Sequence, residues 1–322
     1  MAALVLIERN QFRYIEDMPD SNTEWPAWEV YRVGICRTDV NLTHNPARTN
    51  TVLGHEVVCR DGHGQYYALN NEINCGECDY CLEGKTSHCR HMRELGVNEH
   101  GGFASKIHAP ANNLVPFTCI DHRIGVLIEP LACAIHGIKR LDTVLNTQSE
   151  IKVLVQGSGI SGKLITYLLH TLYPALELTL YDVQADAMAW AESYPAIQRI
   201  TEIPQEHFHV AIECSGSQQG LADCFHAVRR GGTLMIYGVP LAEATFSFSP
   251  NELMTREINL VTSLAGCDRE TFCQSRDTVV AHQPFFSTLL GKTIGLKALE
   301  KELLHFSPIL GTKTLVDPLS TI

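Results

Sequence analysis

The chain has 322 residues, of which 45% are hydrophobic and 19% are charged, a balance that is typical of a globular protein and excludes intrinsic disorder. Its 25 Lys and Arg residues against 36 Asp and Glu residues give a formal net charge of −11, so nucleic acid and anionic membranes are not expected as partners. The length predicts two domains.

The first segment, residues 1–8, is predicted to form a strand. It lacks the basic start and the small-residue cleavage site of a signal peptide, so we expect a cytoplasmic protein. Without an export signal, the twelve cysteines are expected to be thiols or metal ligands rather than disulfides. The most hydrophobic stretch, residues 123–138, is shorter than the roughly 20 residues of a membrane-spanning helix and contains Glu129, so it is predicted to lie in the core.

Side chains that can bind a metal stand in three separate segments of the first 130 residues. Cys36 follows an alternating hydrophobic run at 30–35 and is expected at the end of a strand. His55 and Glu56 begin another strand, and Glu129 would be a buried carboxylate that needs a cation or its own proton. Each alone is more often a core residue than a ligand. Together they offer one sulfur, one nitrogen and one or two carboxylates, the donor set of a catalytic zinc ion with an open position.

Four more cysteines, Cys75, Cys78, Cys81 and Cys89, follow one another with two, two and seven residues between them. Four thiolates from one short segment suit a tetrahedral zinc ion, and a site closed by protein ligands is structural because no position remains for substrate. We therefore predict a structural zinc site, and leave open whether the metal serves folding or assembly.

A strand pattern at 151–156 is followed by Gly157-Ser-Gly159-Ile-Ser-Gly162 and by hydrophobic residues at helical spacing over 165–172. The next strand, 176–181, ends at Asp182, about twenty residues past Gly162, where a dinucleotide-binding fold places the acid that binds the ribose 2′-hydroxyl. This carboxylate would repel a 2′-phosphate, and residues 183–187 include no Arg or Lys, which predicts NAD rather than NADP. The pyrophosphate is expected at the helix N-terminus.

Further strands are predicted at 208–213, 232–238 and 258–263, with a helix at 218–229, and this alternation favours a doubly wound parallel sheet. Residues 61–64 are predicted to form a hairpin turn, and a last strand is expected at 313–316. We expect an interrupted arrangement, in which residues 1–130 and 266–322 form a mostly-β catalytic domain with the structural zinc lobe. Residues 131–265 would form the inserted NAD-binding domain.

The order of these motifs over nearly the whole chain resembles the medium-chain, zinc-dependent alcohol dehydrogenase family, and Glu129-Pro-Leu131 is similar to its polyol, sugar and threonine dehydrogenase branches. The resemblance implies an α/β protein with a GroES-like catalytic domain, an inserted Rossmann domain and a substrate cleft between them. It also implies a homodimer or homotetramer, one catalytic and one structural zinc, and hydride transfer between NAD and a small-molecule alcohol or carbonyl, such as a polyol or sugar.

The resemblance also implies roles for single residues. Cys36, His55 and Glu129 would bind the catalytic zinc, Glu56 is a ligand in some members, and Thr38 matches the hydroxyl that accepts the alcohol proton. The structural-zinc positions match Cys75, Cys78, Cys81 and Cys89, and the cofactor positions match Gly157, Gly159, Ile160, Gly162 and Asp182. Arg37 either contacts the pyrophosphate, as in some members, or is a solvated charge.

The sequence departs from the family pattern in several places. Asn41 replaces a histidine that relays protons in many members, which leaves His44 either as a substitute or as a surface histidine. Cys133, four residues past Glu129, competes with it as the third ligand, although the Glu-Pro-Leu match favours Glu129. Two other function classes stay open: an NAD-binding protein with structural zinc but no alcohol turnover, such as a sensor or interaction protein, and a zinc-independent enone or quinone reductase.

Overall fold

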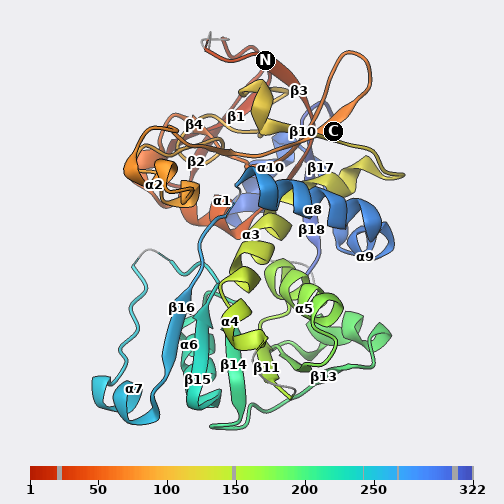
Figure 1. Cartoon of the computed structure of the whole chain (residues 1–322). Coiled ribbons are helices and arrows are strands. Elements are labelled where there is room, and N and C mark those ends of the chain that lie inside the picture. Colours follow the sequence, from red (N-terminus) through yellow and green to blue (C-terminus); the bar gives the residue numbers. More distant parts are fainter. Residues whose placement is uncertain (20–23, 147–149, 242, 267, 307–310, 321–322) are drawn as a thin grey trace. The chain divides into compact units, whose positions relative to one another are not determined.

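The computed structural model describes residues 1–19, 24–146, 150–241, 243–266, 268–306 and 311–320, so Cys267 lies outside the described residues. The chain forms two compact units (Figure 1). Unit 1 consists of Met1–Ala132 and Gly266–Ile322, and unit 2 is the continuous segment Cys133–Ala265.

Unit 1 is built mainly from strands. Its largest sheet runs in the order β10-β6-β5-β3-β18-β17, with β9 also pairing with β3, and smaller sheets are formed by β2-β1-β4 and β7-β8. The strands are β1 (Ala3–Glu8), β2 (Gln11–Ile15), β3 (Ala27–Gly34), β4 (Thr51–Val52), β5 (Glu56–Arg60), β6 (Tyr66–Leu69), β7 (Glu72–Ile73), β8 (Arg93–Glu94), β9 (Lys106–His108), β10 (Leu114–Phe117), β17 (Leu290–Gly295) and β18 (Lys313–Asp317). The strands predicted at 1–8, 30–35 and 313–316 are confirmed as β1, β3 and β18.

Most of the helices described in unit 1 are shorter than ten residues, and those labelled η are 3₁₀ helices. The helices are α1 (Arg37–Leu42), η1 (Pro46–Arg48), α2 (Asp79–Leu82), η2 (Thr86–His88), η3 (Ala111–Asn113), η4 (His122–Leu127), α8 (Arg269–Ala281), α9 (Gln283–Thr288) and α10 (Leu296–Leu304), and α3 (Ile128–Lys139) continues into unit 2. The hydrophobic stretch at 123–138 forms η4 and most of α3, and Ile124, Leu127 and Ile128 are fully buried, as expected of a core segment. None of the helices in the described residues is both long and apolar enough to cross a membrane.

The predicted hairpin turn at 61–64 joins the antiparallel strands β5 and β6. The Asp61 carboxylate accepts backbone N–H groups of His63 and Gln65, at 2.9 Å each, and Gly64 has a φ of 84°. A glycine adopts this left-handed conformation without the steric cost that a side chain imposes. The turn prediction is therefore confirmed.

Unit 2 contains a six-stranded sheet in the order β13-β12-β11-β14-β15-β16, in which every neighbouring pair is parallel. Its elements are α4 (Asp142–Leu145), β11 (Lys152–Gln156), α5 (Ile160–Leu172), β12 (Glu177–Tyr181), η5 (Ala185–Ser193), β13 (Ile197–Arg199), β14 (Phe208–Glu213), α6 (Gln218–Ala227), β15 (Val228–Ile236), α7 (Pro250–Arg256) and β16 (Asn259–Thr262). The chain runs outward from β11 in one direction and from β14 in the other. The doubly wound parallel sheet is confirmed, and its switch point lies between the carboxyl ends of β11 and β14, where such sheets bind ligands.

The helix predicted at 218–229 ends two residues early, and this boundary was wrong. Val228 already pairs with Phe208 of β14, and β15 begins there. Ladder pairing and the strand preference of a β-branched residue outweigh the helical pattern at this point.

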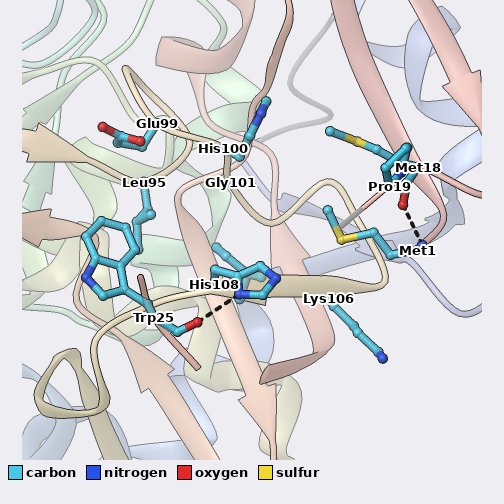
Figure 2. A pocket seen from close by; sticks show the side chains of 11 residues that line it. Met1, Met18, Pro19, Trp25, Leu95, Glu99, His100, Gly101, Lys106 and His108 are labelled. Atoms are coloured by element: carbon cyan, nitrogen blue, oxygen red, sulfur yellow. Dashed lines mark hydrogen bonds between the residues drawn. The ribbon is translucent and has the colours of Figure 1, made fainter. Parts of the chain in front are cut away.

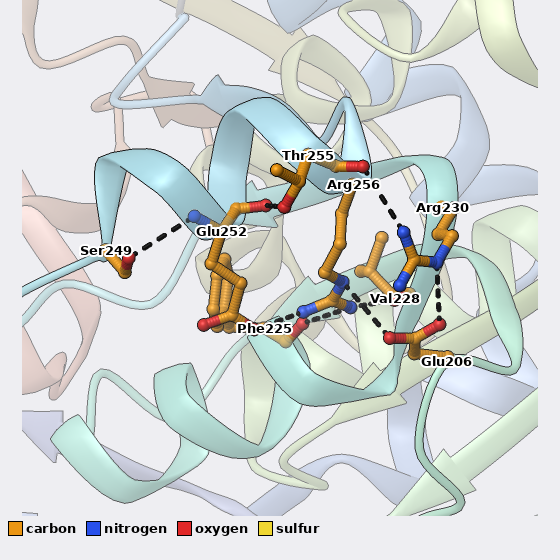
Figure 3. Close-up of polar contacts among 8 residues, drawn as sticks. All are labelled: Glu206, Phe225, Val228, Arg230, Ser249, Glu252, Thr255 and Arg256. Atoms are coloured by element: carbon orange, nitrogen blue, oxygen red, sulfur yellow. Dashed lines mark hydrogen bonds and ion pairs between the residues drawn. The ribbon is translucent and has the colours of Figure 1, made fainter.

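The α7 helix is held against the rest of unit 2 by the buried side chain of Arg256, which is 4% exposed (Figure 3). Its guanidinium donates to Glu252 Oε1 at 2.8 Å, to the Phe225 carbonyl at 3.2 Å and to the Val228 carbonyl. It also lies over the Phe225 ring, 5.1 Å from its centroid. Because a buried charge needs such partners, this network fixes α7 at the junction of α6 and β15.

Candidate functional site

Cys36, His55 and Glu56 come together in unit 1, where one ligand atom from each lies within 4.8 Å of the others. The pairing of β3 with β5 explains this meeting, because Gly34 lies opposite Glu56 in the antiparallel register. Cys36 follows the end of β3 as the N-cap of α1, and His55 immediately precedes β5. Residues far apart in sequence are thus brought to one end of a strand pair.

Asp39 holds this group together, although the sequence analysis gave it no role. Its carboxylate is fully buried and accepts the backbone N–H of Cys36 at 2.8 Å and that of Gly54 at 3.1 Å. Its Oδ1 also lies 3.2 Å from Nδ1 of His55. Burial acts to lower the pKa of His55, but the charges of Asp39 and Cys36 outweigh it and hold that pKa well above its usual value. A carboxylate at Nδ1 orients an imidazole so that Nε2 can face a metal.

Glu56 is fully buried and is paired with Lys313, whose amine lies 2.6 Å from Oε1. The same amine donates to the Ile35 carbonyl at 3.2 Å. Burial acts to lower the pKa of Lys313, but the charge of Glu56, with smaller contributions from Cys36 and Glu129, raises it above its usual value. Lys313 is therefore a cation at neutral pH, and it neutralises one oxygen of Glu56.

The second oxygen, Glu56 Oε2, is buried and has no hydrogen-bond partner among the residues that the structure describes. Leaving a buried carboxylate oxygen without a partner is costly. A side chain at position 34 would place its Cβ 2.1 Å from this oxygen, so glycine there keeps the space open. A sulfur, an imidazole and a carboxylate oxygen without a partner form a donor set that fits zinc.

The other predicted residues of this site lie on two helices. Thr38 is half-buried on α1, two residues after Cys36, whereas Arg37 is exposed, with its guanidinium 6.0 Å from the centroid of the Phe306 ring. Glu129 is 9% exposed near the start of α3 and acts electrostatically on Lys313, but it is not one of the three groups within 4.8 Å. His44 is exposed, and its Nδ1 lies 3.2 Å from Nδ2 of Asn10.

The four cysteines Cys75, Cys78, Cys81 and Cys89 form the second group, again with ligand atoms within 4.8 Å. Sulfur–sulfur distances of 3.9 Å, 4.0 Å and 3.5 Å compare with the roughly 3.8 Å expected for tetrahedral zinc with Zn–S bonds of about 2.3 Å. The backbone N–H of Arg90 lowers the pKa of Cys78 to about 6, whereas burial raises that of Cys81 to about 12. A divalent cation would keep all four thiolates ionised despite their mutual repulsion.

The glycine loop of unit 2 joins β11 to α5 at the switch point of the sheet. Gly157 has a φ of 101°, and a Cβ on Gly162 would lie 1.8 Å from the Gly157 carbonyl oxygen. A side chain at either position would therefore disturb this turn. A Cβ on Gly159, the N-cap of α5, would meet nothing within 4 Å. Ile160 is the first residue of α5 and is half-buried. The open space at Gly159 and the N–H groups of the helix start fit a pyrophosphate.

Asp182 follows β12 directly and is fixed by the loop beside it. Its two carboxylate oxygens accept the backbone N–H groups of Ser158, at 2.6 Å, and Gln184, at 2.8 Å. The Ser158 hydroxyl donates to the Ala187 carbonyl at 2.8 Å and accepts from Nε1 of Trp190 at 2.9 Å. The glycine loop, Asp182 and η5 are therefore one connected network, which orients the carboxylate predicted to bind the ribose.

A small pocket in unit 1 is separate from these groups (Figure 2). It lies where the Met1 amine donates to the Met18 carbonyl at 3.0 Å and where Nδ1 of His108 lies 2.9 Å from the Trp25 carbonyl. Its volume of about 40 Å³ has room for only a few water molecules. None of the predicted site residues lines it, so we do not assign it to the substrate.

Sequence reasoning missed Asp39 and Lys313. Asp39 stands in the same motif as Cys36, and its place three residues after an N-cap could have marked it as a residue that bonds back to that backbone. Lys313 had no local signal, because its partner Glu56 is 257 residues away in the sequence.

Two family models match the chain. Residues 28–119 match the alcohol dehydrogenase GroES-like domain, and residues 182–280 match the zinc-binding dehydrogenase domain. The D-arabinitol dehydrogenase 1 of Uromyces fabae is 25% identical over 298 residues, covering 82% of each chain. The L-idonate 5-dehydrogenase (NAD(P)(+)) of Escherichia coli is 26% identical over 274 residues, covering 76% of this chain and 78% of the relative.

Solved structures agree on the fold. The crystal structure of L-idonate 5-dehydrogenase from Escherichia coli superposes with a TM-score of 0.82 at 23% identity, covering 98% of this chain and 97% of that one. Acetophenone reductase from Geotrichum candidum, in complex with NAD, gives a TM-score of 0.83 at 19% identity, covering 100% and 98%. The expected combination of a GroES-like domain and a Rossmann domain is thereby confirmed, and the chain belongs to the medium-chain, zinc-dependent alcohol dehydrogenase family.

Proposed function

We propose that this chain catalyses the zinc- and NAD-dependent oxidation of a polyol, a sugar or a related alcohol, together with the reverse reduction. The observation that carries the proposal is the meeting of Cys36, His55 and Glu56, whose ligand atoms lie within 4.8 Å of one another. One oxygen of Glu56 is also buried and has no hydrogen-bond partner among the described residues. Relatives named for arabinitol and idonate support a hydroxyl-rich substrate.

In this proposal Cys36, His55 and Glu56 hold the catalytic zinc. Glu129, whose charge acts on Lys313, the partner of Glu56, is a further ligand. Cys75, Cys78, Cys81 and Cys89 hold the structural zinc. Zinc in the first site would supply Lewis acidity towards the oxygen of an alcohol. Asp39 orients His55, and Lys313 neutralises Glu56, so that the donors are held before the metal binds.

The overall reaction removes a hydride from the carbinol carbon and a proton from the hydroxyl, and yields a carbonyl compound, NADH and a proton. NAD is the hydride acceptor. The Thr38 hydroxyl takes the hydroxyl proton and passes it on, which is the role of a positioned relay group. Asn41 cannot titrate, so it would not carry the proton away from Thr38, and water would have to do so. The exposed position of His44 and its contact with Asn10 favour a surface histidine over a relay.

In unit 2 we assign the pyrophosphate to the loop of Gly157, Gly159 and Gly162, beside Ile160. Asp182, whose carboxylate is held by the backbone N–H groups of Ser158 and Gln184, would bind the adenosine ribose. We further propose that unit 1 is the catalytic domain and unit 2 the NAD-binding domain.

We also propose that the protein is cytoplasmic and forms a homodimer or homotetramer. Strand β16 is one edge of the described sheet of unit 2, where it pairs only with β15. Leu260 on β16 and Leu264 just after it are 43% and 74% exposed. An unpaired strand edge with exposed apolar side chains supports pairing with a second copy. The mass of the native protein in solution, measured by light scattering, tests this point.

The decisive experiment counts zinc in the purified wild-type protein and in Cys36→Ser by elemental analysis, alongside NADH formation from a panel of polyols and sugar acids. We expect two zinc ions per wild-type chain, one in the variant, and turnover only in the wild type. One zinc ion in both proteins, without turnover of any alcohol, would instead support the non-catalytic NAD-binding alternative. NADP-dependent reduction of enones without metal at Cys36 would support the reductase alternative.

A further inference from the structure

A lysine outside the local segment 183–187 interacts electrostatically with the proposed ribose acid, Asp182. Lys163 follows the third glycine of the loop directly and lies in the first turn of α5, where its backbone N–H donates to the Gly159 carbonyl at 2.9 Å. Its side chain is 4% exposed, which is unusual for a lysine. A charge buried at this position needs a reason.

The helix spacing places Lys163 on the face of α5 that also carries Tyr167 and His170. Lys163, Tyr167 and His170 follow one another at i, i+4 and i+7 and so share one face of α5. The ring centroids of Tyr167 and His170 lie 6.0 Å and 5.5 Å from that of Tyr194. The Tyr194 ring is in turn 5.7 Å from that of Trp190 on η5. This face of α5 therefore points to the segment that follows Asp182.

The same segment is tied to Asp182. Trp190 donates to the Ser158 hydroxyl, and the Ser158 backbone N–H donates to the Asp182 carboxylate. Burial lowers the pKa of Lys163 to about 8, and the charge of Asp182 acts in the opposite direction, so the two groups interact electrostatically. At neutral pH Lys163 is therefore still a cation.

We propose that Lys163 is a positioning residue that compensates the charge of Asp182, so that the cofactor site prefers NAD only moderately and also accepts NADP. This inference rests on the proposed NAD site in unit 2. An uncompensated carboxylate would repel a 2′-phosphate, whereas a carboxylate beside a buried ammonium group repels it much less. The positive charge belongs to Lys163 on α5, so residues 183–187 alone do not show it.

The test is fluorescence titration of the purified enzyme with NADH and with NADPH, in the wild type and in Lys163→Met. The readout is the ratio of the Kd for NADPH to the Kd for NADH, which a purely structural role would leave unchanged. We expect this ratio to be within about tenfold in the wild type and to rise about another tenfold in the variant. Lys152→Met is the matched control, because Lys152 begins β11 at the other end of the strand, 3.9 Å from Glu177. It should leave the ratio unchanged.

An unchanged ratio in Lys163→Met, with both cofactors bound as before or weakened by the same factor, would overturn the proposal. If Lys163→Met does not fold, Asp182→Asn decides the matter, because it leaves Lys163 as an uncompensated cation. We then expect NADPH to bind more tightly than NADH, and equal binding would contradict the role of Lys163. A wild-type enzyme that binds neither dinucleotide would refute the proposed function itself.

Discussion

The amine of Lys313 lies 2.6 Å from Oε1 of Glu56, and both side chains are almost completely buried. Two strand pairings create this contact, because Gly34 of β3 lies opposite both Glu56 of β5 and Leu315 of β18. The last strand of unit 1 thus supplies the counter-charge of a residue in the candidate zinc site. It ties the C-terminal segment to residues near position 36.

Replacement of Lys313 by methionine should leave the buried Glu56 carboxylate without its cation. Breaking a buried ion pair from one side costs about 3–5 kcal/mol, and we expect a loss of that size in the free energy of unfolding, measured in urea on samples of equal zinc content. The control is Lys292→Met, which removes a more exposed pair with Glu302 at a cost below about 1 kcal/mol. Equal losses in the two variants would contradict a special role for Lys313.

Replacement of Gly34 by alanine should disturb the candidate catalytic zinc site without touching a ligand. Its Cβ would lie 2.1 Å from Glu56 Oε2, so the carboxylate has to move. We expect zinc content to fall from two ions per chain towards one and turnover to fall at least about tenfold. Gly62→Ala is the matched control, because a Cβ there meets nothing within 4 Å. Full zinc content in Gly34→Ala would speak against Glu56 as a ligand.

Replacement of Cys89 by serine should remove the structural zinc, because Cys89 contributes one of four sulfurs and is 8% exposed. We expect one zinc ion fewer per chain and a lower melting temperature, since metal binding contributes to folding stability. Cys119→Ser alters a half-buried cysteine outside both groups and should retain both metals. Two zinc ions in Cys89→Ser would rule out the four-cysteine site.

Replacement of Trp190 by phenylalanine removes the N–H that bonds to the Ser158 hydroxyl while it keeps an aromatic ring. Loss of one hydrogen bond costs about 1 kcal/mol, so we expect NADH to bind about fivefold more weakly in a fluorescence titration. Trp28→Phe, which removes a bond to the Ala109 carbonyl in unit 1, is the control for a general loss of stability. If both variants bind NADH as the wild type does, Trp190 does not shape the cofactor loop.

The pH dependence of stability should reveal Lys163. Burial lowers its pKa from the usual 10.5 to about 8, so between about pH 8 and pH 10.5 the unfolded chain holds a proton that the folded chain has lost. Stability then rises with pH in this window, and below it the full cost of the buried charge remains. We expect the free energy of unfolding of the wild type, relative to Lys163→Met, to increase by about 2 kcal/mol between pH 7.5 and pH 10. A flat difference would show that Lys163 keeps its usual pKa.

Much of the fold follows from local patterns in the sequence. The strand at 151–156, the glycine turn and the helix after it need only residues within about twenty positions of one another, and the structure places β11 and α5 there. The same holds for the hairpin turn, whose aspartate and glycines are a local turn signal. The end of α6 was predicted wrongly because Val228 is drawn into a strand by Phe208, a partner 20 residues earlier.

The sequence by itself determined which residue types are available: four cysteines at zinc spacing, a sulfur, an imidazole and carboxylates for a second metal, and a glycine loop followed by an acid. Only the tertiary structure decided their partners. The Asp39–His55 contact, the Lys313–Glu56 pair and the electrostatic interaction of Lys163 with Asp182 all join separate elements of the chain. Spacing in the sequence reports on neighbours along a strand or helix, whereas sheet register and helix packing bring these charges together.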